Sequence, residues 1–263
     1  MIDSGVLNWT LTQVLLLLVI LIRVGPLIFL MPVTGSRGVP GQVKILISLM
    51  TALVLVPVIR IDPGILPESA IDFIIFVGRE FCIGMTLALF VRFVFAAVET
   101  AGQMVGIQMG MGMAGTMDPQ FGVQISLVGF FWNLVAILIF LSLDGHHLFF
   151  RTLADSFDWI QPGGMEITQA TYLGILKGAA NMFVLAVKIM APAGAALFFS
   201  HVAMGIIAKT VPQIPILIVG LPVNIAIGLI FVGLSLSYLA PLMISNFDML
   251  GRLLPRLAAG LGG

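Results

Sequence analysis

Long apolar runs separated by short polar breaks organise this chain of 263 residues. Six apolar segments cover residues 6–33, 43–59, 71–98, 121–143, 170–208 and 214–245. A helix needs about 20 residues to cross a bilayer, so most segments are long enough and the fifth is nearly twice as long as needed. Runs such as VLLLLVILI lack the period-two alternation of strands. The pattern therefore predicts an all-α fold, an integral-membrane-type bundle of long helices and helical hairpins.

Several prolines fall inside these segments or near their ends. Proline removes a backbone donor and bends a helix, so we expect the long helices to be kinked. The prolines concerned are Pro26, Pro57, Pro192, Pro222 and Pro241.

The composition agrees with a membrane environment. Hydrophobic residues make up 60% of the chain and charged residues 9%, whereas a soluble domain carries about 25% charged residues. The formal net charge is zero and no basic run is present, so nothing suggests a nucleic-acid partner. The first segment lacks the basic n-region of a cleavable signal peptide. Cys82 is the single cysteine, which excludes a disulfide framework within the chain.

Charged residues within the apolar segments need partners. A charge at bilayer depth costs about 3 kcal/mol on insertion scales, so such groups normally face protein or water. Adjacent side chains on a helix point about 100° apart, so Arg79 and Glu80 each require a partner of their own. We expect Arg79, Glu80, Arg92 and Lys188 to make contacts with other subunits. For Arg92, snorkelling at a helix end stays open as an alternative.

No constellation of residues suggests catalysis. His146 and His147 follow Asp144 in LDGHHLFF. Adjacent histidines on a helix point apart and lack the i, i+4 spacing of a shared metal site, so a helix or loop boundary explains them better. His201 is isolated, and no phosphate loop or nucleophile elbow is present. We expect neither an enzyme nor a cofactor.

The stretch GQMVGIQMGMGMAGTMDPQFG, residues 102–122, holds six glycines, five methionines and one charge. Gly102, Gly106 and Gly110 recur at i, i+4 and i+8, which is typical of a close helix-packing face. The glycines and Pro119 that follow disfavour a continued helix, and methionine adapts to irregular surfaces. The alternative is therefore a deformable seal, and this is the interpretation that we favour.

Three motifs carry a family resemblance. They are AGQMVGIQMGMGMAGTMDPQ at 101–120, FLSLDGHHLFFRTLADSF at 140–157 and GIIAKTVPQIPILIVGLPVNIAIGL at 205–229. In this order they resemble the FliR/SctT family, the R-type subunit of the type III protein export gate. VPQIPI at 211–216 differs from the family's more usual polar form of the last motif.

The resemblance implies a subunit of a hetero-oligomeric, helical export gate in the bacterial inner membrane, at the flagellar basal body. Its partners would be the P-type and Q-type subunits FliP and FliQ, FlhB and FlhA, unfolded export substrates and membrane lipid. Residues 1–165 would form a P-type-like part that includes the stretch 102–122. Residues 166–263 would form a Q-type-like hairpin that turns at Lys209, Pro212 and Gln213.

The resemblance also implies that the glycine- and methionine-rich stretch is a plug in the export passage. The residues expected to form this plug are Gly106, Gln108, Met109, Gly110, Met111, Gly112, Met113, Met117, Asp118 and Phe121. A small-solute transporter or channel is the alternative function, because broken helices and intramembrane charges are typical of transporters as well.

Overall fold

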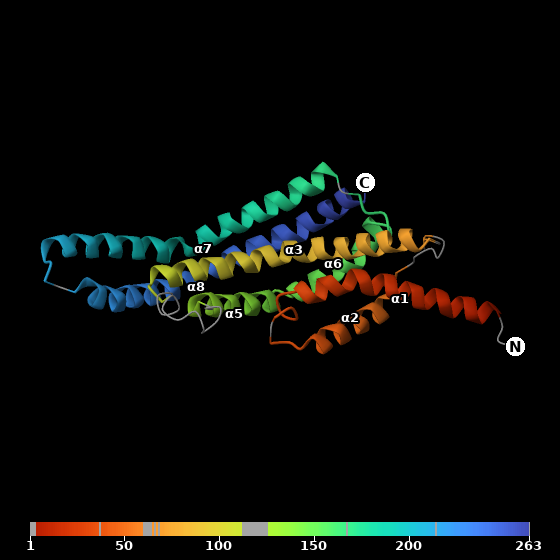
Figure 1. Cartoon of the computed structure of the whole chain (residues 1–263), viewed down its shortest axis with the longest axis horizontal. Helices are drawn as coiled ribbons and strands as arrows, with labels where there is room; N and C mark the ends of the chain where they lie inside the picture. Colours follow the sequence, from red (N-terminus) through yellow and green to blue (C-terminus); the bar gives the residue numbers. More distant parts are fainter. Residues whose placement is uncertain are drawn as a thin grey trace. The chain divides into compact units, whose positions relative to one another are not determined.

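The computed structural model describes residues 4–36, 38–59, 65, 67, 69–111, 126–166, 168–213 and 215–262. Every regular element in these ranges is a helix, which confirms the all-α prediction (Figure 1). The helices are α1 (Ser4–Leu30), α2 (Gly41–Leu55), α3 (Ala70–Gln108), α5 (Leu127–Ser142), α6 (Gly145–Trp159), α7 (Gln169–Thr210) and α8 (Ile216–Leu261).

The six predicted segments correspond to α1, α2, α3, α5, α7 and α8. Two differences have a physical reason. Helix α6 was not predicted as an apolar segment because only a narrow stripe, Phe149, Leu153 and Phe157 at a spacing of four residues, is apolar and buried. Helices α3 and α8 continue beyond the apolar runs to Gln108 and Leu261, because mixed sequence can extend an existing helix at little cost.

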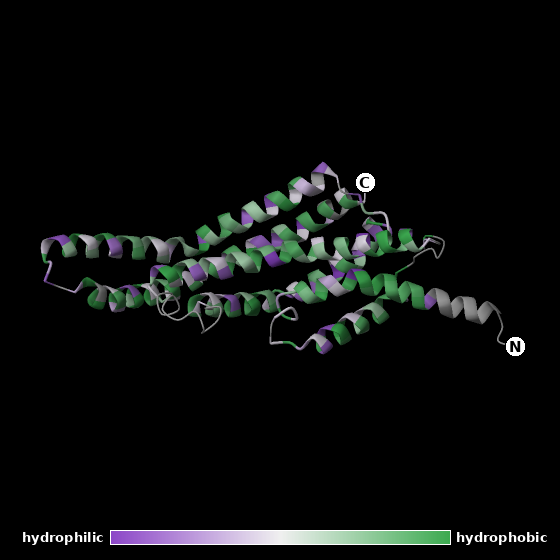
Figure 2. Cartoon of the chain, in the orientation of Figure 1, coloured by the Kyte–Doolittle hydropathy of each residue, from purple (hydrophilic) through white to green (hydrophobic). Residues whose placement is uncertain are grey.

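Among the described residues, four helices contain stretches long and apolar enough to cross a membrane: Gln13–Leu30, Ala70–Gln108, Thr171–Thr210 and Ile218–Pro255. The pair α5–α6, broken at Leu143 and Asp144, would make a fifth span if it counted as one. Hydrophobic residues extend along most of α3, α7 and α8 (Figure 2). Only 33% of the α7 span and 28% of the α8 span are buried within the chain.

The chain folds into two compact units that interleave along the sequence. Unit 1 comprises residues 1–93, 144–178 and 248–263, and unit 2 comprises residues 94–143 and 179–247. The predicted division into residues 1–165 and 166–263 rests on the resemblance to P-type and Q-type subunits. The two compact units do not test this division.

In unit 1, α1 and α3 come into close contact at Gly84. A Cβ atom at this position would collide with the backbone carbonyl of Arg23, so only glycine allows the two helices to approach this closely. The C-terminal end of α8 is fixed in the same unit. Thr168 and Thr171 both donate hydroxyl hydrogen bonds of 3.0 Å to the carbonyl of Gly260.

In unit 2, the core is built from aromatic side chains and close glycine contacts. The rings of Phe95, Phe140 and Phe247 pack mutually, with centroids 5.2–5.9 Å apart. Helices α3 and α5 touch where Gly102 meets the backbone of Gly129. Ser126 fixes this crossing, because its hydroxyl donates to the carbonyl of Gly102 at 3.0 Å and caps the start of α5.

We expect Gly102→Ala to destabilise the protein, because the new methyl group would force apart the backbones of α3 and α5. Overpacking of this kind typically costs about 1–3 kcal/mol. Gly205→Ala is a matched control within α7, since nothing lies within 4 Å of a Cβ there. The midpoint of heat-induced aggregation in detergent measures both changes. The close contact is not needed if Gly102→Ala leaves this temperature unchanged.

Candidate functional site

The described part of the glycine- and methionine-rich stretch is the C-terminal end of α3. Gly110 has a φ of +80°, a conformation that glycine adopts without strain. The amide of Met111 donates to the carbonyl of Gly106, and the amide of Gly110 donates to that of Ile107. These two bonds form a Schellman motif, so Gly110 ends the helix.

Met109, the residue just before Gly110, is fully buried in unit 2. Its side chain occupies the space in front of Gly228 in α8, where a Cβ atom would overlap the Met109 thioether. Gly106 similarly lies against the side chain of Ser126. Residues 102–110 therefore have the close helix packing that the glycine spacing predicted as one alternative.

A cavity of about 320 Å³ lies next to this helix end in unit 2. Its polar lining comes from Gln108 on α3, His201 on α7 and Asn224 on α8. The hydroxyl of Ser200 donates to the side-chain oxygen Oδ1 of Asn224 at 2.7 Å, and the side-chain nitrogen Nδ2 of Asn224 lies 3.1 Å from Nε2 of His201. The buried Oε1 of Gln108 has no hydrogen-bond partner among the described residues.

The structure therefore places half of the predicted plug residues. Gly106, Gln108, Met109, Gly110 and Met111 lie at or just after the end of α3. The plug role itself stays a prediction. The remaining predicted plug residues, Gly112, Met113, Met117, Asp118 and Phe121, lie outside the described residues.

A buried ion pair forms the centre of unit 1. The side chains of Arg23 on α1 and Glu80 on α3 are both fully buried, and Nε of Arg23 lies 2.7 Å from Oε2 of Glu80. The second nitrogen, Nη2, donates to Oε1 of the same carboxylate at 3.1 Å, which makes the contact bidentate. An isolated ion would not be stable in this apolar interior, so each charge requires the other.

The rest of the guanidinium binds the C-terminal end of α6. Nη1 donates to the carbonyls of Ser156 at 2.9 Å and Ile160 at 3.2 Å, and the group lies 4.0 Å from the ring centroid of Phe157. A positive charge is favourable at a helix C-terminus, where the last carbonyls lack partners. Arg23 thus joins α1, α3 and α6.

The neighbouring turn at residues 161–164 explains why two opposite charges stand side by side on α3. Pro162 followed by Gly163 at a φ of +75° is the residue pattern of a type II turn. The amide of Gly163 donates to Oε1 of Glu80 at 2.8 Å, and Nη1 of Arg79 donates to the carbonyl of Gly163 at 2.8 Å. Arg79 and Glu80 therefore bind the backbone carbonyl and the backbone amide, respectively, of the same residue, Gly163.

The predicted charged contacts thus divide into two groups. Glu80 has the partner that its position demands, but the partner is Arg23 of the same chain and not a group on another subunit. Arg79, Arg92 and Lys188 are exposed on the single chain, and contacts of these three residues with other subunits stay predictions. The role of Pro162 and Gly163 was missed, although this dipeptide is a recognisable turn signal.

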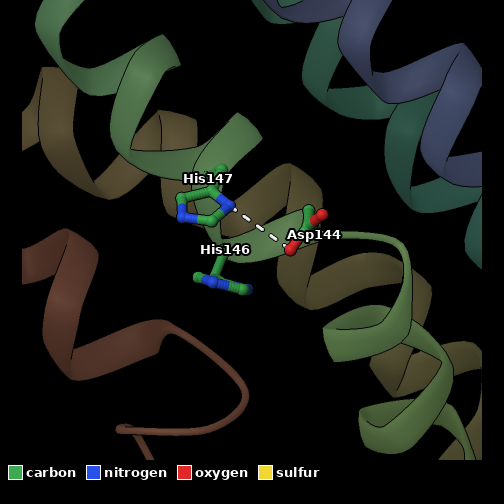
Figure 3. Close-up of side chains that lie close together, drawn as sticks. All are labelled: Asp144, His146 and His147. Carbon is green, nitrogen blue, oxygen red and sulfur yellow. Dashed lines mark ion pairs between the residues drawn. The ribbon is translucent and has the colours of Figure 1, made fainter.

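Asp144, His146 and His147 lie close together where α6 begins (Figure 3). The expected helix boundary is present, since Asp144 is the N-cap residue with a φ of 52°. The prediction that the two histidines point apart is wrong, because their ring centroids are 4.2 Å apart. Neighbouring Cα atoms are only about 3.8 Å apart, so side-chain rotation can bring the rings together even when the Cβ directions diverge.

Two imidazoles and one carboxylate could bind a divalent ion, and their ligand atoms lie within 4.8 Å of one another. However, Nδ1 of His147 already pairs with Asp144 at 3.3 Å, with both side chains exposed. The positive end of the α6 dipole also opposes a cation here. We assign no metal to this cluster.

Comparison with known proteins identifies related sequences over most of the chain. The model of the family described as bacterial export proteins, family 1, matches residues 14–250. Flagellar biosynthetic protein FliR of Pectobacterium carotovorum subsp. carotovorum is 29% identical, covering 90% of this chain and 92% of the relative. The FliR proteins of Bacillus subtilis (strain 168) and Escherichia coli (strain K12) are 31% and 26% identical, covering 88% and 84% of this chain and 90% and 84% of the relatives.

We expect Glu80→Gln to destabilise unit 1 strongly. The variant keeps the shape of the side chain but leaves the buried charge of Arg23 unpaired, and breaking a buried pair typically costs about 3–5 kcal/mol. The yield of folded protein in detergent and its aggregation temperature would measure the loss. Arg79→Ala is the control, since it removes only an exposed contact to the same turn. Equal losses in the two variants would contradict the central role of the pair.

Proposed function

Because the chain belongs to family 1 of the bacterial export proteins, we propose that it is a non-enzymatic core subunit of the flagellar type III protein export gate. Its relatives carry the name flagellar biosynthetic protein FliR, which supports a role in building the flagellum. In this proposal the chain forms, together with P-type and Q-type subunits, the passage for exported flagellar proteins in the inner membrane.

The length of the apolar helices is the observation that carries the proposal. Helix α7 has 42 residues and α8 has 46, so their contour lengths are about 63 and 69 Å at roughly 1.5 Å per residue. The hydrocarbon core of a bilayer is about 30 Å thick. Lipid can therefore cover only about half of each helix, even with some tilt.

The remaining apolar surface needs protein to cover it. Large exposed side chains occur along both helices, including Phe183, Phe198 and Phe199 of α7 and Ile230 and Leu234 of α8. Exposed apolar surface that lipid does not cover is typical of an interaction site. Helical partner subunits that surround the chain on several sides, as in a hetero-oligomeric gate with FliP- and FliQ-type subunits, would provide this cover.

The plug is the finer part of the proposal. The Schellman motif ends α3 at Gly110, so the helix stops within the glycine- and methionine-rich stretch, before most of the methionine and glycine residues that follow Met109. Met109 stays anchored in unit 2 against Gly228. We place the seal in the residues after this anchor, where flexible methionines could close the passage at rest and yield to an unfolded chain.

Co-expression tests the assembly. We expect the chain to aggregate or be degraded when expressed alone, and to purify with P-type and Q-type subunits when these are supplied, because its apolar surface then has cover. Size-exclusion chromatography in detergent with mass spectrometry of the peak would measure this. A monodisperse, heat-resistant monomer would contradict the proposal and favour the transporter alternative.

Deletion of residues 112–117 tests the plug. We expect the complex to assemble normally while cells become leaky to small solutes, because the deletion spares the anchor at Met109. Met111→Leu with Met113→Leu should instead slow export with little leak, since leucine keeps the volume but is less flexible. Solute uptake and flagellin export in the same strains provide the two measurements. Failure to assemble without any leak would assign the stretch to packing alone.

A further inference from the structure

Lys188 lies in the middle of α7 and has no ion-pair partner among the described residues. It is residue 20 of the 42 in this helix, about 28 Å from one end and about 33 Å from the other. Its side chain is exposed, beside Val184 and Val187, which are 51% and 56% exposed. Apart from Lys188, residues 182–199 contain no charged or polar side chain.

The described part of the chain offers this lysine no carboxylate. The ion pairs there include Arg23 with Glu80, His147 with Asp144 and Arg151 with Asp155, and Lys188 belongs to none of these. The sequence of unit 2 contains two acidic residues, Glu99 and Asp118. Glu99 has an interaction of its own, and Asp118 lies outside the described residues.

A lipid headgroup fits this position less well than a protein carboxylate. At the membrane interface, Lys and Arg are accompanied by Trp, Tyr and other polar residues. The apolar tract around Lys188 contains none of them on either side. An ammonium group surrounded by apolar surface is costly unless an opposite charge lies within reach.

We propose that Lys188 docks an apolar helix of a partner subunit by pairing with an Asp or Glu carboxylate on that helix. The neighbouring surface suits this geometry, because the exposed residues one and two turns further along, Ala191 and Ala195, are small enough for a second helix to approach. The inference rests on the proposed function, since it requires an assembly, and it adds the chemistry of one contact.

A membrane-permeant carbodiimide tests the contact directly in the purified wild-type complex. The carboxylate adds to the carbodiimide to give an O-acylisourea, and the Lys188 amine then attacks the acyl carbon, which forms an amide bond and releases the carbodiimide as its urea. We expect mass spectrometry to find a peptide that links Lys188 to an acidic residue of a partner subunit. A link from Lys188 to Asp118 of the same chain would overturn the proposal.

Substitutions test whether the charge matters for assembly. We expect Lys188→Glu to lower the yield of complex by roughly tenfold or more, and Lys188→Met to lower it less. Lys188→Arg should assemble normally but lose the cross-link. The matched control is Lys209→Glu, an exposed lysine in the last turn of the same helix, which should assemble normally.

The outcomes separate this inference from the proposed function. If the wild-type chain purifies without partners, the proposed function fails. If the wild-type complex forms and Lys188→Glu assembles equally well, Lys188 faces water or the passage and this inference alone is overturned. Restoration of the Lys188→Glu complex by an acidic-to-lysine change at the cross-linked residue of the partner would support it.

Discussion

The bidentate pair between Arg23 and Glu80 is the interaction on which unit 1 depends. Two fully buried ions are stable in an apolar interior only if each polar atom finds a partner. The guanidinium therefore requires the carboxylate from α3, the last carbonyls of α6 and the ring of Phe157 at the same time. Because Glu80 also binds the amide of Gly163, the pair fixes the turn after α6 as well. Helices α1, α3 and α6 and this turn thus share one set of contacts.

Unit 2 is held together in a different way. Its core has no buried ion pair among the described residues, and its helices instead approach closely at glycines, with large side chains filling the remaining space. Gly102 meets Gly129, and Gly228 makes room for the buried Met109. Close packing of this kind needs no charge and suits an apolar environment. It also fixes the first part of the glycine- and methionine-rich stretch, since Gly102 and Met109 are held by these contacts.

The sequence predicted the long helices because the length of an apolar run and its lack of period-two alternation are local properties. It also predicted that Glu80 needs a partner, which follows from its charge alone. The identity of that partner could not be predicted, since Arg23 lies 57 residues away and only the fold brings the two together. Helix α6 was not predicted because its apolar stripe is narrow. The convergence of His146 and His147 depends on side-chain rotation, which residue spacing does not determine.

The same contacts bear on the choice between a gate subunit and a solute transporter. A transporter binds its solute with polar groups that are free to receive it, often charges at broken helices. In unit 1 the buried charges are already occupied, because all three guanidinium nitrogens of Arg23 and both carboxylate oxygens of Glu80 have partners within the chain. In unit 2 the cavity at Gln108, His201 and Asn224 has polar groups, but the described surface of α7 and α8 is rich in exposed apolar side chains, with Lys188 exposed among them. These apolar helices are too long for lipid alone to cover and therefore need protein neighbours, which favours the gate.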